Sequence, residues 1–287
     1  VEIGEELGRE DDVVLGLEHV ATSLALMTRF EEAREKAQQA LRLAREMGDR
    51  EHEATLLTST LPMIYLRDGD ISSAIASLLA GLEIAKRIGA LYPQVDGGWF
   101  LAEIARWRGE YEQALEYGQL ALNAALPMEE FMPFAVVPPL STLGSVYLEI
   151  SPQFRDKITE FHHHALRLLE SPAGAMTGST AWADLGFCAM TLGDMQLADE
   201  SIQKGLNYPT MFSLMERARL LAGAALLART RGEPDEARRS IEEAQSYAQE
   251  RGMRNLYPLL FLVEGKIHLA RDEVMESLID LEKAEEL

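Results

Sequence analysis

The sequence predicts an all-α protein, a solenoid of antiparallel helix pairs that repeats about every 40 residues. Three observations lead to this fold class. A stripe of small residues recurs along the chain at spacings of 39 to 44 residues. Turn-forming and helix-capping residues precede most copies of that stripe. Hydrophobic residues make up 47% of the 287 positions, which is enough for a continuous core between stacked helices.

The repeating stripe is clearest at residues 108–122, RGEYEQALEYGQLAL. Ala114, Gly118 and Ala121 fall on one side of a helix, where their small size lets a second helix approach closely. The positions equivalent to Ala114 are Ala33, Ala74, Ala114, Ile158, Ala198, Ala237 and Ser277. Seven residues after each of them lies another small residue: Ala40, Gly81, Ala121, Ala165, Gly205, Ala244 and Ala284.

A matching set of positions lies twelve residues before the first set, in the preceding helix. These positions are Ala21, Pro62, Ala102, Val146, Gly186, Ala225 and Gly265. Most are Ala or Gly, so each repeat is expected to be two helices in close contact. Pro62 is an exception, and it predicts a kink or a local unwinding of its helix.

The turns before the second helices carry helix-start signals. Asp70 and Asp194 each follow a Gly and can accept hydrogen bonds from the free backbone N–H groups of a helix N-terminus. Pro234 suits the first helical position, where its missing N–H costs nothing. Acidic residues concentrate in the first turns, where the helix dipole favours negative charge.

This pattern resembles the tetratricopeptide repeat, whose signature places Trp, Leu-Gly and a small residue on the first helix and two small residues around an apolar one on the second. The fifth copy resembles it most closely, through Trp182, Leu185, Gly186, Ala198, Ile202 and Gly205. The period exceeds the family's usual length of about 34 residues, which indicates longer helices. The resemblance implies a right-handed superhelix.

The second helices also show a style of their own. Runs such as residues 40–49 and 81–90 continue the helix for extra turns before a Gly ends it. This form resembles the repeat arrays of large bacterial signalling ATPases and of transcriptional regulators of the maltose-activator type. It is also similar to arrays that follow some nucleotide cyclase domains.

Residues 9–287 divide into seven expected helix pairs. Their approximate bounds are 11–48, 49–89, 90–126, 127–170, 171–208, 209–252 and 253–287. Residues 1–8 align with the end of a second helix, so we expect them to be the tail of a preceding, truncated repeat. The last pair has no polar capping helix after it, which favours a piece of a longer array.

One irregular stretch, residues 127–139, interrupts the repeats with four prolines and accounts for the longest spacing. Two interpretations are open. The stretch is either a structural insertion that packs its own apolar residues on the solenoid, or a lid over the groove or self-association patch.

Composition narrows the function classes. The net charge of −20 argues against direct nucleic-acid binding by this region. No apolar run reaches the length of a membrane span, and no secretory signal is visible. The single cysteine, Cys188, cannot form an internal disulfide, which favours a cytoplasmic setting.

The sequence offers no recognisable catalytic or cofactor chemistry. It contains no P-loop, no dinucleotide-binding glycine fingerprint and no GxSxG motif, so we expect neither an enzyme nor a cofactor. His162, His163 and His164 are adjacent, but successive helical residues point about 100° apart and cannot converge on one ion. No metal site is predicted.

The resemblance also implies that the first helix of each pair lines a concave groove. The inward positions would be Glu18, Arg67, Asp96, Trp99, Glu103, Arg106, Trp107, Tyr147, Phe187, Met190, Arg219, Arg229 and Lys266. Cations outnumber acids in this set although the whole chain is acidic. We therefore expect a protein or peptide segment that is acidic, or a small anionic ligand. In the alternative, the aromatic residues only pack the repeats and the arginines pair with glutamates inside the groove.

These observations favour a binding or sensing module within a larger bacterial signal-transduction or transcription-regulating protein. Such a module would recognise a partner and pass the effect to other domains. Two alternatives are a passive protein-interaction scaffold and a regulatory appendage of a nucleotide cyclase or other enzyme. The residues do not indicate an oligomeric state.

Overall fold

The computed structural model describes residues 9–169, 178–208, 213–253 and 256–286, and these contain helices and turns but no β-strand. The predicted repeat tail at residues 1–8 lies outside the described residues. The chain forms two compact units, Val1–Val146 and Tyr147–Leu287, which divide within helix α9. The all-α class predicted from the sequence is confirmed.

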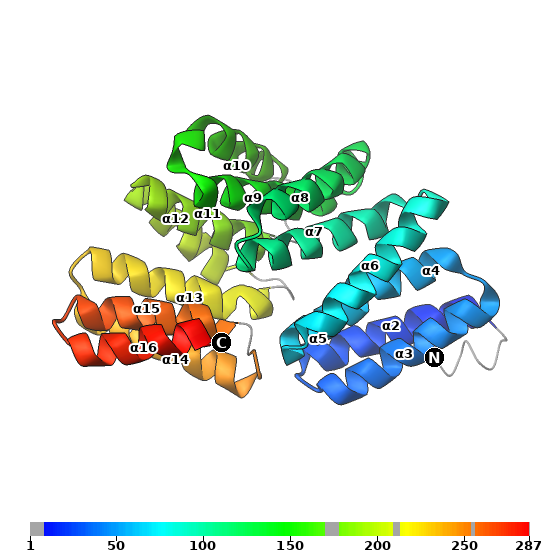
Figure 1. Ribbon diagram of the computed structural model, residues 1–287, viewed down its shortest axis with the longest axis horizontal. Coiled ribbons are helices and arrows are strands. Elements are labelled where there is room, and N and C mark those ends of the chain that lie inside the picture. The colour runs from blue at the N-terminus through cyan, green and yellow to red at the C-terminus, as the bar shows by residue number, and fades with distance from the viewer. Residues whose placement is uncertain (1–8, 170–177, 209–212, 254–255, 287) are drawn as a thin grey trace. The chain divides into compact units, whose positions relative to one another are not determined.

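The first unit runs from α2 into α9. Its elements are α2 (Glu10–Leu26), α3 (Phe30–Met47), α4 (Arg50–Thr55), η1 (Leu56–Thr60), α5 (Leu61–Asp68), α6 (Ile71–Ile88), α7 (Leu91–Trp107), α8 (Tyr111–Ala125), η2 (Leu126–Met128) and α9 (Pro133–Ile150). Helix α2 packs on α3, and α7 packs on α8. The α4, η1 and α5 segments form one interrupted helix that packs on α6 (Figure 1).

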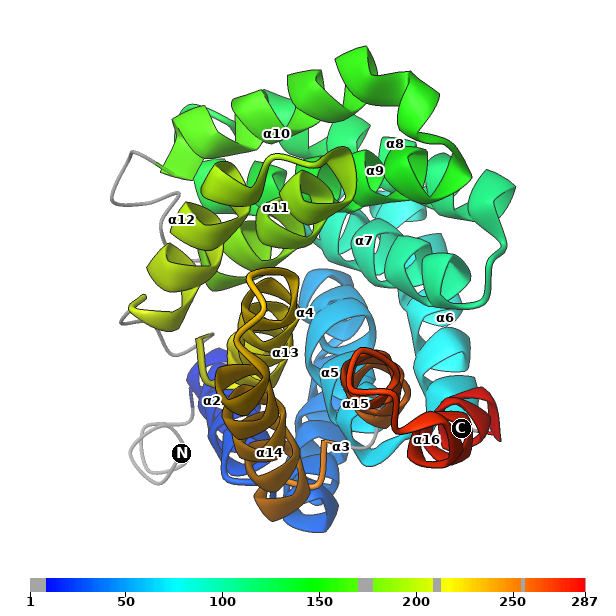
Figure 2. The same ribbon diagram turned by 90° about the vertical axis from the view of Figure 1, so that its left-hand side faces the viewer.

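The second unit continues from the end of α9. Its elements are η3 (Pro152–Phe154), α10 (Arg155–Leu169), α11 (Gly178–Leu192), α12 (Met195–Leu206), α13 (Ser213–Thr230), α14 (Pro234–Glu250), α15 (Tyr257–Leu269) and α16 (Val274–Glu286). Helix α13 packs on α14 and α15 packs on α16 (Figure 2), and α14 also contacts α15.

The helices of a pair touch through the small residues that define the repeat. Ala33, Ala74, Ala114, Ala198 and Ala237 are all completely buried. Glycine is also required where a second helix lies closest to the first helix of the next pair, because a side chain there would collide with it. A Cβ added at Gly205 would lie 2.5 Å from a methyl group of Leu220, and one at Gly118 would lie 2.8 Å from Leu143.

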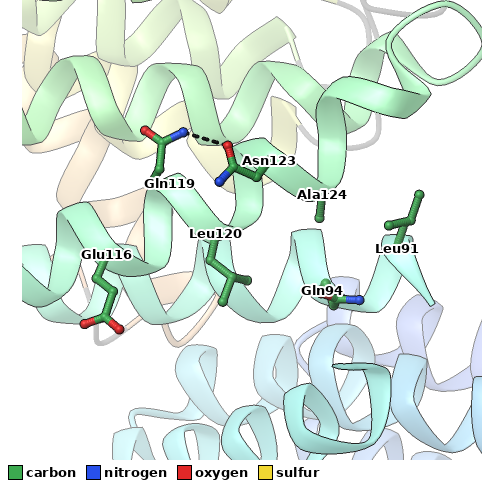
Figure 3. A pocket seen from close by; sticks show the side chains of 7 residues that line it. All are labelled: Leu91, Gln94, Glu116, Gln119, Leu120, Asn123 and Ala124. Carbon is green, nitrogen blue, oxygen red and sulfur yellow. Dashed lines mark hydrogen bonds between the residues drawn. The ribbon is translucent and has the colours of Figure 1, made fainter. Parts of the chain in front are cut away.

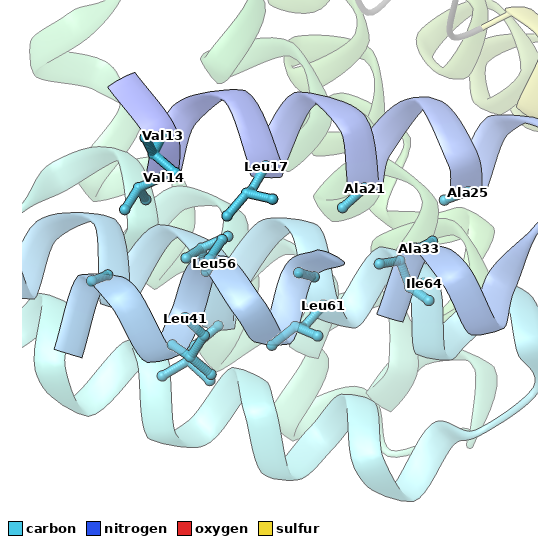
Figure 4. Close-up of a cluster of buried hydrophobic side chains, with 14 residues drawn as sticks. Val13, Val14, Leu17, Ala21, Ala25, Ala33, Leu41, Leu56, Leu61 and Ile64 are labelled. Atoms are coloured by element: carbon cyan, nitrogen blue, oxygen red, sulfur yellow. The ribbon is translucent and has the colours of Figure 1, made fainter. Parts of the chain in front are cut away.

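Larger side chains fill the space around these contacts. Figure 4 shows the cluster at the start of the first unit, where Val14 and Leu17 of α2 meet Leu41 of α3. Leu56 and Ile64, from the interrupted helix, complete it and are fully buried. The core of each unit therefore lies between neighbouring helices.

The predicted start signals act as helix caps. The Oδ1 atoms of Asp70 and Asp194 accept hydrogen bonds from the backbone N–H groups of Ser73 and Leu197, both at 3.0 Å. Pro234 is the first residue of α14. These contacts satisfy backbone donors that have no partner inside the helix.

Pro62 has the local effect that the sequence predicts. It lacks an N–H, so it cannot bond the carbonyl oxygen of Thr58, and its ring crowds that carbonyl. The five residues before Leu61, Leu56–Thr60, form a π-helical turn, η1, in which the Leu61 N–H donates to the Leu56 carbonyl. The wider turn changes the directions in which Ser59 and Thr60 point.

The sequence predicts an irregular insertion over residues 127–139, but the second half of this stretch is helical. Helix α9 begins at Pro133, and Pro138 and Pro139 lie inside it and are buried. Pro133 can begin the helix because the first position needs no N–H donor. Only residues 126–132 separate α8 from α9, with Met128 buried and Phe131 67% exposed.

Candidate binding surfaces on the first helices

Buried charge is concentrated on the first helix of each pair. Among the described residues, four of the five buried carboxylate or guanidinium side chains lie on first helices. They are Glu53 on α4, Arg67 on α5, Glu103 on α7 and Asp184 on α11. Burying a charge is costly unless it is paired, so each of these side chains is expected to have polar partners nearby.

The first such place surrounds the π-helical turn of the first unit. We name it the carboxyl cluster, and it consists of Glu18, Ser59, Thr60, Tyr92 and Asp96. The Thr60 hydroxyl donates a hydrogen bond of 3.0 Å to Oε1 of Glu18. On the other side lies Asp96, whose pKa burial raises and the nearby Ser59 and Tyr92 hydroxyls lower. Two adjacent hydroxyls of η1 thus lie near a carboxylate of α2 and a carboxylate of α7.

Close packing holds the turn in this place. The Ser77 hydroxyl donates to the Leu57 carbonyl at 2.8 Å, so α6 satisfies a backbone acceptor of η1. A Cβ added at Gly97 would lie 3.1 Å from a methyl group of Thr58, and one at Gly81 only 2.6 Å from the same methyl group. Helices α6 and α7 therefore both lie directly against the turn.

The electrostatics of the cluster favour a protonated Asp96. Burial is the main cause and the negative charge of Glu18 adds to it, so the pKa of Asp96 rises to about 7 despite the hydrogen bonds from Ser59 and Tyr92. The Asp96 charge, followed by burial, raises the pKa of Tyr92. Near neutral pH, this carboxyl therefore changes charge with small changes in its surroundings.

A second polar network lies further along α7. Oε1 of Glu103 accepts from the Thr142 hydroxyl at 2.7 Å, and Oε2 accepts from Nη2 of Arg106 at 2.7 Å. The indole N–H of Trp99 donates to the Thr142 oxygen at 3.1 Å. Three of the predicted groove residues are thus joined in one network, and Thr142 of α9 completes it. Trp107 is not part of it and is 50% exposed.

Arg67 is placed differently from the expectation of a groove-lining cation. Its side chain is buried, and Nη1 donates to the Ala25 carbonyl at the end of α2, 3.3 Å away. The Ala25 carbonyl also accepts from the backbone N–H of Thr28 at 3.0 Å, so the guanidinium is a second donor to this oxygen at the helix end. A ligand could reach it only by displacing this contact.

The second unit has its own buried ion pair on first helices. Arg219 of α13 bonds Asp184 of α11 at 2.5 Å and Glu216 at 2.9 Å. Its guanidinium also lies 5.8 Å from the ring centre of Phe187. The predicted residues Phe187 and Arg219 are therefore brought together, with the cation already paired. Arg106 and Arg219 each pair with an acidic residue, Arg106 with Glu103 and Arg219 with Asp184.

Tyr147 is covered by residues that follow it in the chain. Its ring stacks on Phe161 with 5.8 Å between centroids, and Lys157 lies 4.7 Å above it. Met190 packs at the edge of a buried cluster in the second unit. These side chains act in packing.

Two predicted cations remain available. Arg229, near the end of α13, and Lys266, on α15, are both exposed. Within the part of the chain that the structure describes, neither has a salt-bridge partner. Helices α13 and α15 are in contact, so both cations belong to one pair of adjacent first helices.

A shallow pocket of about 590 Å³ lies between α7 and α8 (Figure 3). Its lining residues are Leu91, Gln94, Glu116, Gln119, Leu120, Asn123 and Ala124. Gln119 bonds Asn123 at 2.9 Å, and Gln94 bonds the Ala90 carbonyl at 3.0 Å, so these polar groups are satisfied by each other and by the backbone. None of the predicted site residues lines it.

The adjacent histidines diverge, as expected. His162 is buried and donates from Nδ1 to the Ile158 carbonyl at 2.8 Å, and burial lowers its pKa. His163 is exposed. Cys188 is a buried free thiol.

Two solved structures share the arrangement of this chain. A tetratricopeptide repeat protein from Parabacteroides merdae is 19% identical, with a TM-score of 0.50 over 96% of this chain and 93% of that one. BtubC (BKLC) from P. vanneervenii is 19% identical, with a TM-score of 0.52 over 74% of this chain and 88% of its own. The fold is that of the tetratricopeptide repeat. No family model and no curated protein sequence matches the chain.

Within this tetratricopeptide fold, the sequence missed some of the residues that matter most. Ser59 and Thr60 join the carboxyl cluster only because η1 is π-helical, and Thr142 reaches Glu103 from the following repeat. A group formed by Glu264, His268 and Asp280 was also missed, although Glu264 and His268 are four residues apart on one helix. That spacing was the available signal.

Proposed function

We propose that this chain is a protein-binding module whose partner contacts the first helices of the repeats. The concentration of buried carboxylate and guanidinium groups on those helices supports the proposal, because packing alone does not require them. Second helices contribute mainly small and aliphatic residues to the core, as α3 does with Ala33, Ala37 and Ala40. The first helices therefore carry the buried polar networks, and two of them, α13 and α15, also carry the exposed cations Arg229 and Lys266.

Each unit offers a different surface. The first unit presents the carboxyl cluster and the network of Trp99, Glu103 and Arg106, in which the one cation is paired. The second unit presents Arg229 and Lys266, which are exposed. We assign the expected acidic peptide segment or small anionic ligand to the first helices of the second unit, where positive charge is available.

The wider setting follows from the style of the repeats. We propose that the module belongs to a larger bacterial protein of signal transduction or transcription regulation, acting in the cytoplasm. Binding would shift its shape only if the partner prefers one arrangement of the helix pairs. A passive scaffold and a regulatory appendage of a cyclase or other enzyme are the competing settings, and the flanking coding sequence distinguishes the appendage directly.

A selection from a random peptide library displayed on phage tests the binding surface. We expect enriched peptides to be rich in Asp and Glu and to bind at least tenfold more weakly to the double variant Arg229→Glu, Lys266→Glu. The matched control is Arg42→Glu, Lys86→Glu, which makes the same charge change on the exposed faces of second helices α3 and α6.

The control separates a local contact from general charge attraction. If both double variants lose the same amount of peptide affinity, binding depends on the net charge of the protein. That result would contradict a binding surface at Arg229 and Lys266. Failure to enrich any peptide, with circular dichroism showing a folded protein, would contradict the binding function. Raising the salt concentration should weaken the interaction, since exposed charges are screened.

Small-angle X-ray scattering distinguishes a sensor from a scaffold. A sensor should change its radius of gyration when the selected peptide binds, whereas a scaffold keeps the same dimensions. The Arg229→Glu, Lys266→Glu variant with the same peptide serves as the unbound reference.

A further inference from the structure

The last two helices bring together three side chains that can act as metal ligands. Glu264 and His268 lie one turn apart on α15, and Asp280 lies on α16, which packs against α15. One donor atom from each of the three lies within 4.8 Å of the others. We name these three residues the α15–α16 donor cluster. It lies wholly within the second unit and involves none of the surfaces described above.

The imidazole of His268 faces a carboxylate on each side. Nδ1 lies 2.8 Å from Oδ2 of Asp280, and Nε2 lies 3.7 Å from Oε2 of Glu273. A neutral imidazole has one N–H donor and one acceptor nitrogen, so it can donate to only one of the two. Both nitrogens can interact favourably with carboxylates only if the other nitrogen also carries a proton or binds a metal ion.

The outer oxygens of the two ligand carboxylates are already held by neighbouring donors. The Gln245 side chain, from α14, donates to Oε2 of Glu264 at 2.6 Å. Lys283 bonds Oδ1 of Asp280 at 3.0 Å. Each carboxylate therefore keeps its second oxygen for the interior of the cluster. Outer contacts of this kind orient the ligands of metal sites.

We propose that the α15–α16 donor cluster binds a divalent transition-metal ion of the Zn²⁺ type. The ligands are Oε1 of Glu264, Nδ1 of His268 and Oδ2 of Asp280. One imidazole with two carboxylates is a donor set that suits Zn²⁺ and its neighbours better than Ca²⁺ or Mg²⁺, which prefer oxygen ligands alone. Nε2–H of His268 then donates towards Glu273.

The geometry needs only side-chain adjustment. Bonds of about 2.1 Å in a tetrahedral arrangement place ligand atoms roughly 3.4 Å apart. The three donor atoms lie within 4.8 Å of one another, and the pair formed by His268 and Asp280 must open slightly from 2.8 Å. Glu264 and His268 are partly exposed, so the ion can enter from solvent and a water can fill the fourth position.

The cations beside the cluster pair with Asp280 and Glu273, and none of the salt bridges among the described residues reaches Glu264. The cluster contains two carboxylates, and Glu273 adds a third beside His268. Lys283 bonds Asp280, while Arg271 and Arg238 both pair with Glu273. The Glu264 carboxylate is held by the neutral Gln245 amide, so the interior of the cluster is where a further positive charge is stabilised.

Titration of the chelator-treated protein with Co²⁺ tests the proposal, because tetrahedral Co²⁺ gives visible absorption bands whose position reports nitrogen ligation. We expect one equivalent of Co²⁺ to bind and Zn²⁺ to displace it. Zn²⁺ should also raise the thermal midpoint in a concentration-dependent way.

Variants identify the ligands. His268→Ala should remove the bands and the thermal shift, and Glu264→Gln should weaken binding at least tenfold. Gln245→Ala should weaken binding less than Glu264→Gln, since it only orients a ligand. The control is His163→Ala, which removes an exposed imidazole from α10 and should leave binding unchanged.

Three outcomes would overturn the site. They are the absence of tetrahedral bands with wild-type protein at millimolar Co²⁺, bands that persist in His268→Ala, and equal losses in His268→Ala and His163→Ala. Far-ultraviolet circular dichroism of each variant without metal shows that it is folded, so a loss of binding reports the ligand itself.

Discussion

At the residue scale, Asp96 shows how local environment sets the behaviour of a carboxyl group. Burial is the main cause of its raised pKa, and Glu18 adds repulsion across the π-helical turn. The hydroxyls of Ser59 and Tyr92 partly offset both effects. The result is a group that titrates near pH 7 on a helix face that we assign to partner binding. Partner contacts that neutralise Glu18 or supply another donor should therefore favour the ionised form of Asp96.

Asp96→Asn should remove this pH dependence. The pKa of Asp96 is about 7 in the folded state, against an ordinary value of 3.8, so the folded protein retains a proton that the unfolded chain releases. Stability from this group is thus present below about pH 4 and lost as pH rises to about 7. Relative to wild type, the variant should gain on the order of 3 kcal/mol over that range.

Urea unfolding at a series of pH values measures this difference. Glu242→Gln, an exposed carboxyl change in the middle of α14, is the control and should show a pH-independent difference from wild type. A constant difference for Asp96→Asn as well would mean that Asp96 titrates normally.

At the element scale, Pro62 and the glycines around it explain why one first helix is interrupted. Pro62 prevents a regular α-helix, and η1 results. Gly81 and Gly97 then let α6 and α7 pack directly against Thr58. The same turn positions the hydroxyls that hold Glu18 and Asp96, so a packing feature and a polar site share one cause.

Gly81→Ala tests that packing. The new methyl group would lie 2.7 Å from Cβ of Leu57 and 3.1 Å from the Ala54 carbonyl oxygen, so the interrupted helix must move. Overpacking costs about 1–3 kcal/mol, which exceeds the gain of roughly 1 kcal/mol in helix propensity. We expect a lower thermal midpoint. Ala80→Gly, at the exposed neighbouring position, measures propensity alone, and a stabilised Gly81→Ala would contradict the close contact.

At the scale of the whole molecule, each helix packs mainly on its neighbours in the chain. In the first unit α6 contacts the α4–η1–α5 helix and α7, and in the second unit α14 contacts α13 and α15. Stability in such a stack is approximately a sum of repeat terms and nearest-neighbour terms. A defect in one repeat should therefore affect its neighbours most strongly.

Leu78→Ala should show this locality by native-state hydrogen exchange. Leu78 is completely buried in a cluster with Leu66, Leu82 and Leu101, and its truncation costs about 2–5 kcal/mol. Protection should fall in α5, α6 and α7 and change little in α14. The reciprocal variant Ile241→Ala, in the buried cluster of α14, should do the opposite. A uniform loss of protection in both variants would show that the chain unfolds as a single cooperative block.

None of the described helices combines the length and hydrophobicity of a bilayer-spanning segment. The fold itself was largely readable from the sequence, since helix contacts in a repeat stack are local and periodic. Ala114, Gly118 and Ala121 report a close helix contact because the spacing of three and four residues is a property of one helix. Helix starts were also predictable, at Asp70, Asp194 and Pro234, because a capping residue acts on backbone groups only a few positions away.

The polar sites were readable only in part. The spacing of Trp99, Glu103 and Arg106 correctly placed them on one face, but the hydroxyl that links Trp99 to Glu103 comes from Thr142, on another helix pair. The sequence also did not show which cations are exposed. Arg67 bonds a backbone carbonyl and Arg219 bonds carboxylates, whereas Arg229 is exposed, and no sequence pattern distinguishes the three.

The sequence by itself determined the class of the protein, namely helices in pairs, with small residues at each contact and caps at each start. Those features depend on neighbours a few residues away and on a repeating period. Only the tertiary structure decided which polar groups meet, because hydrogen bonds and ion pairs depend on directions and distances across helices. The π-helical turn at Leu56–Thr60 and the meeting of His268 with Asp280 are decided there. A shift of one residue in the register between two helices would separate the groups that meet at the π-helical turn, or His268 from Asp280. The sequence pattern does not determine that register.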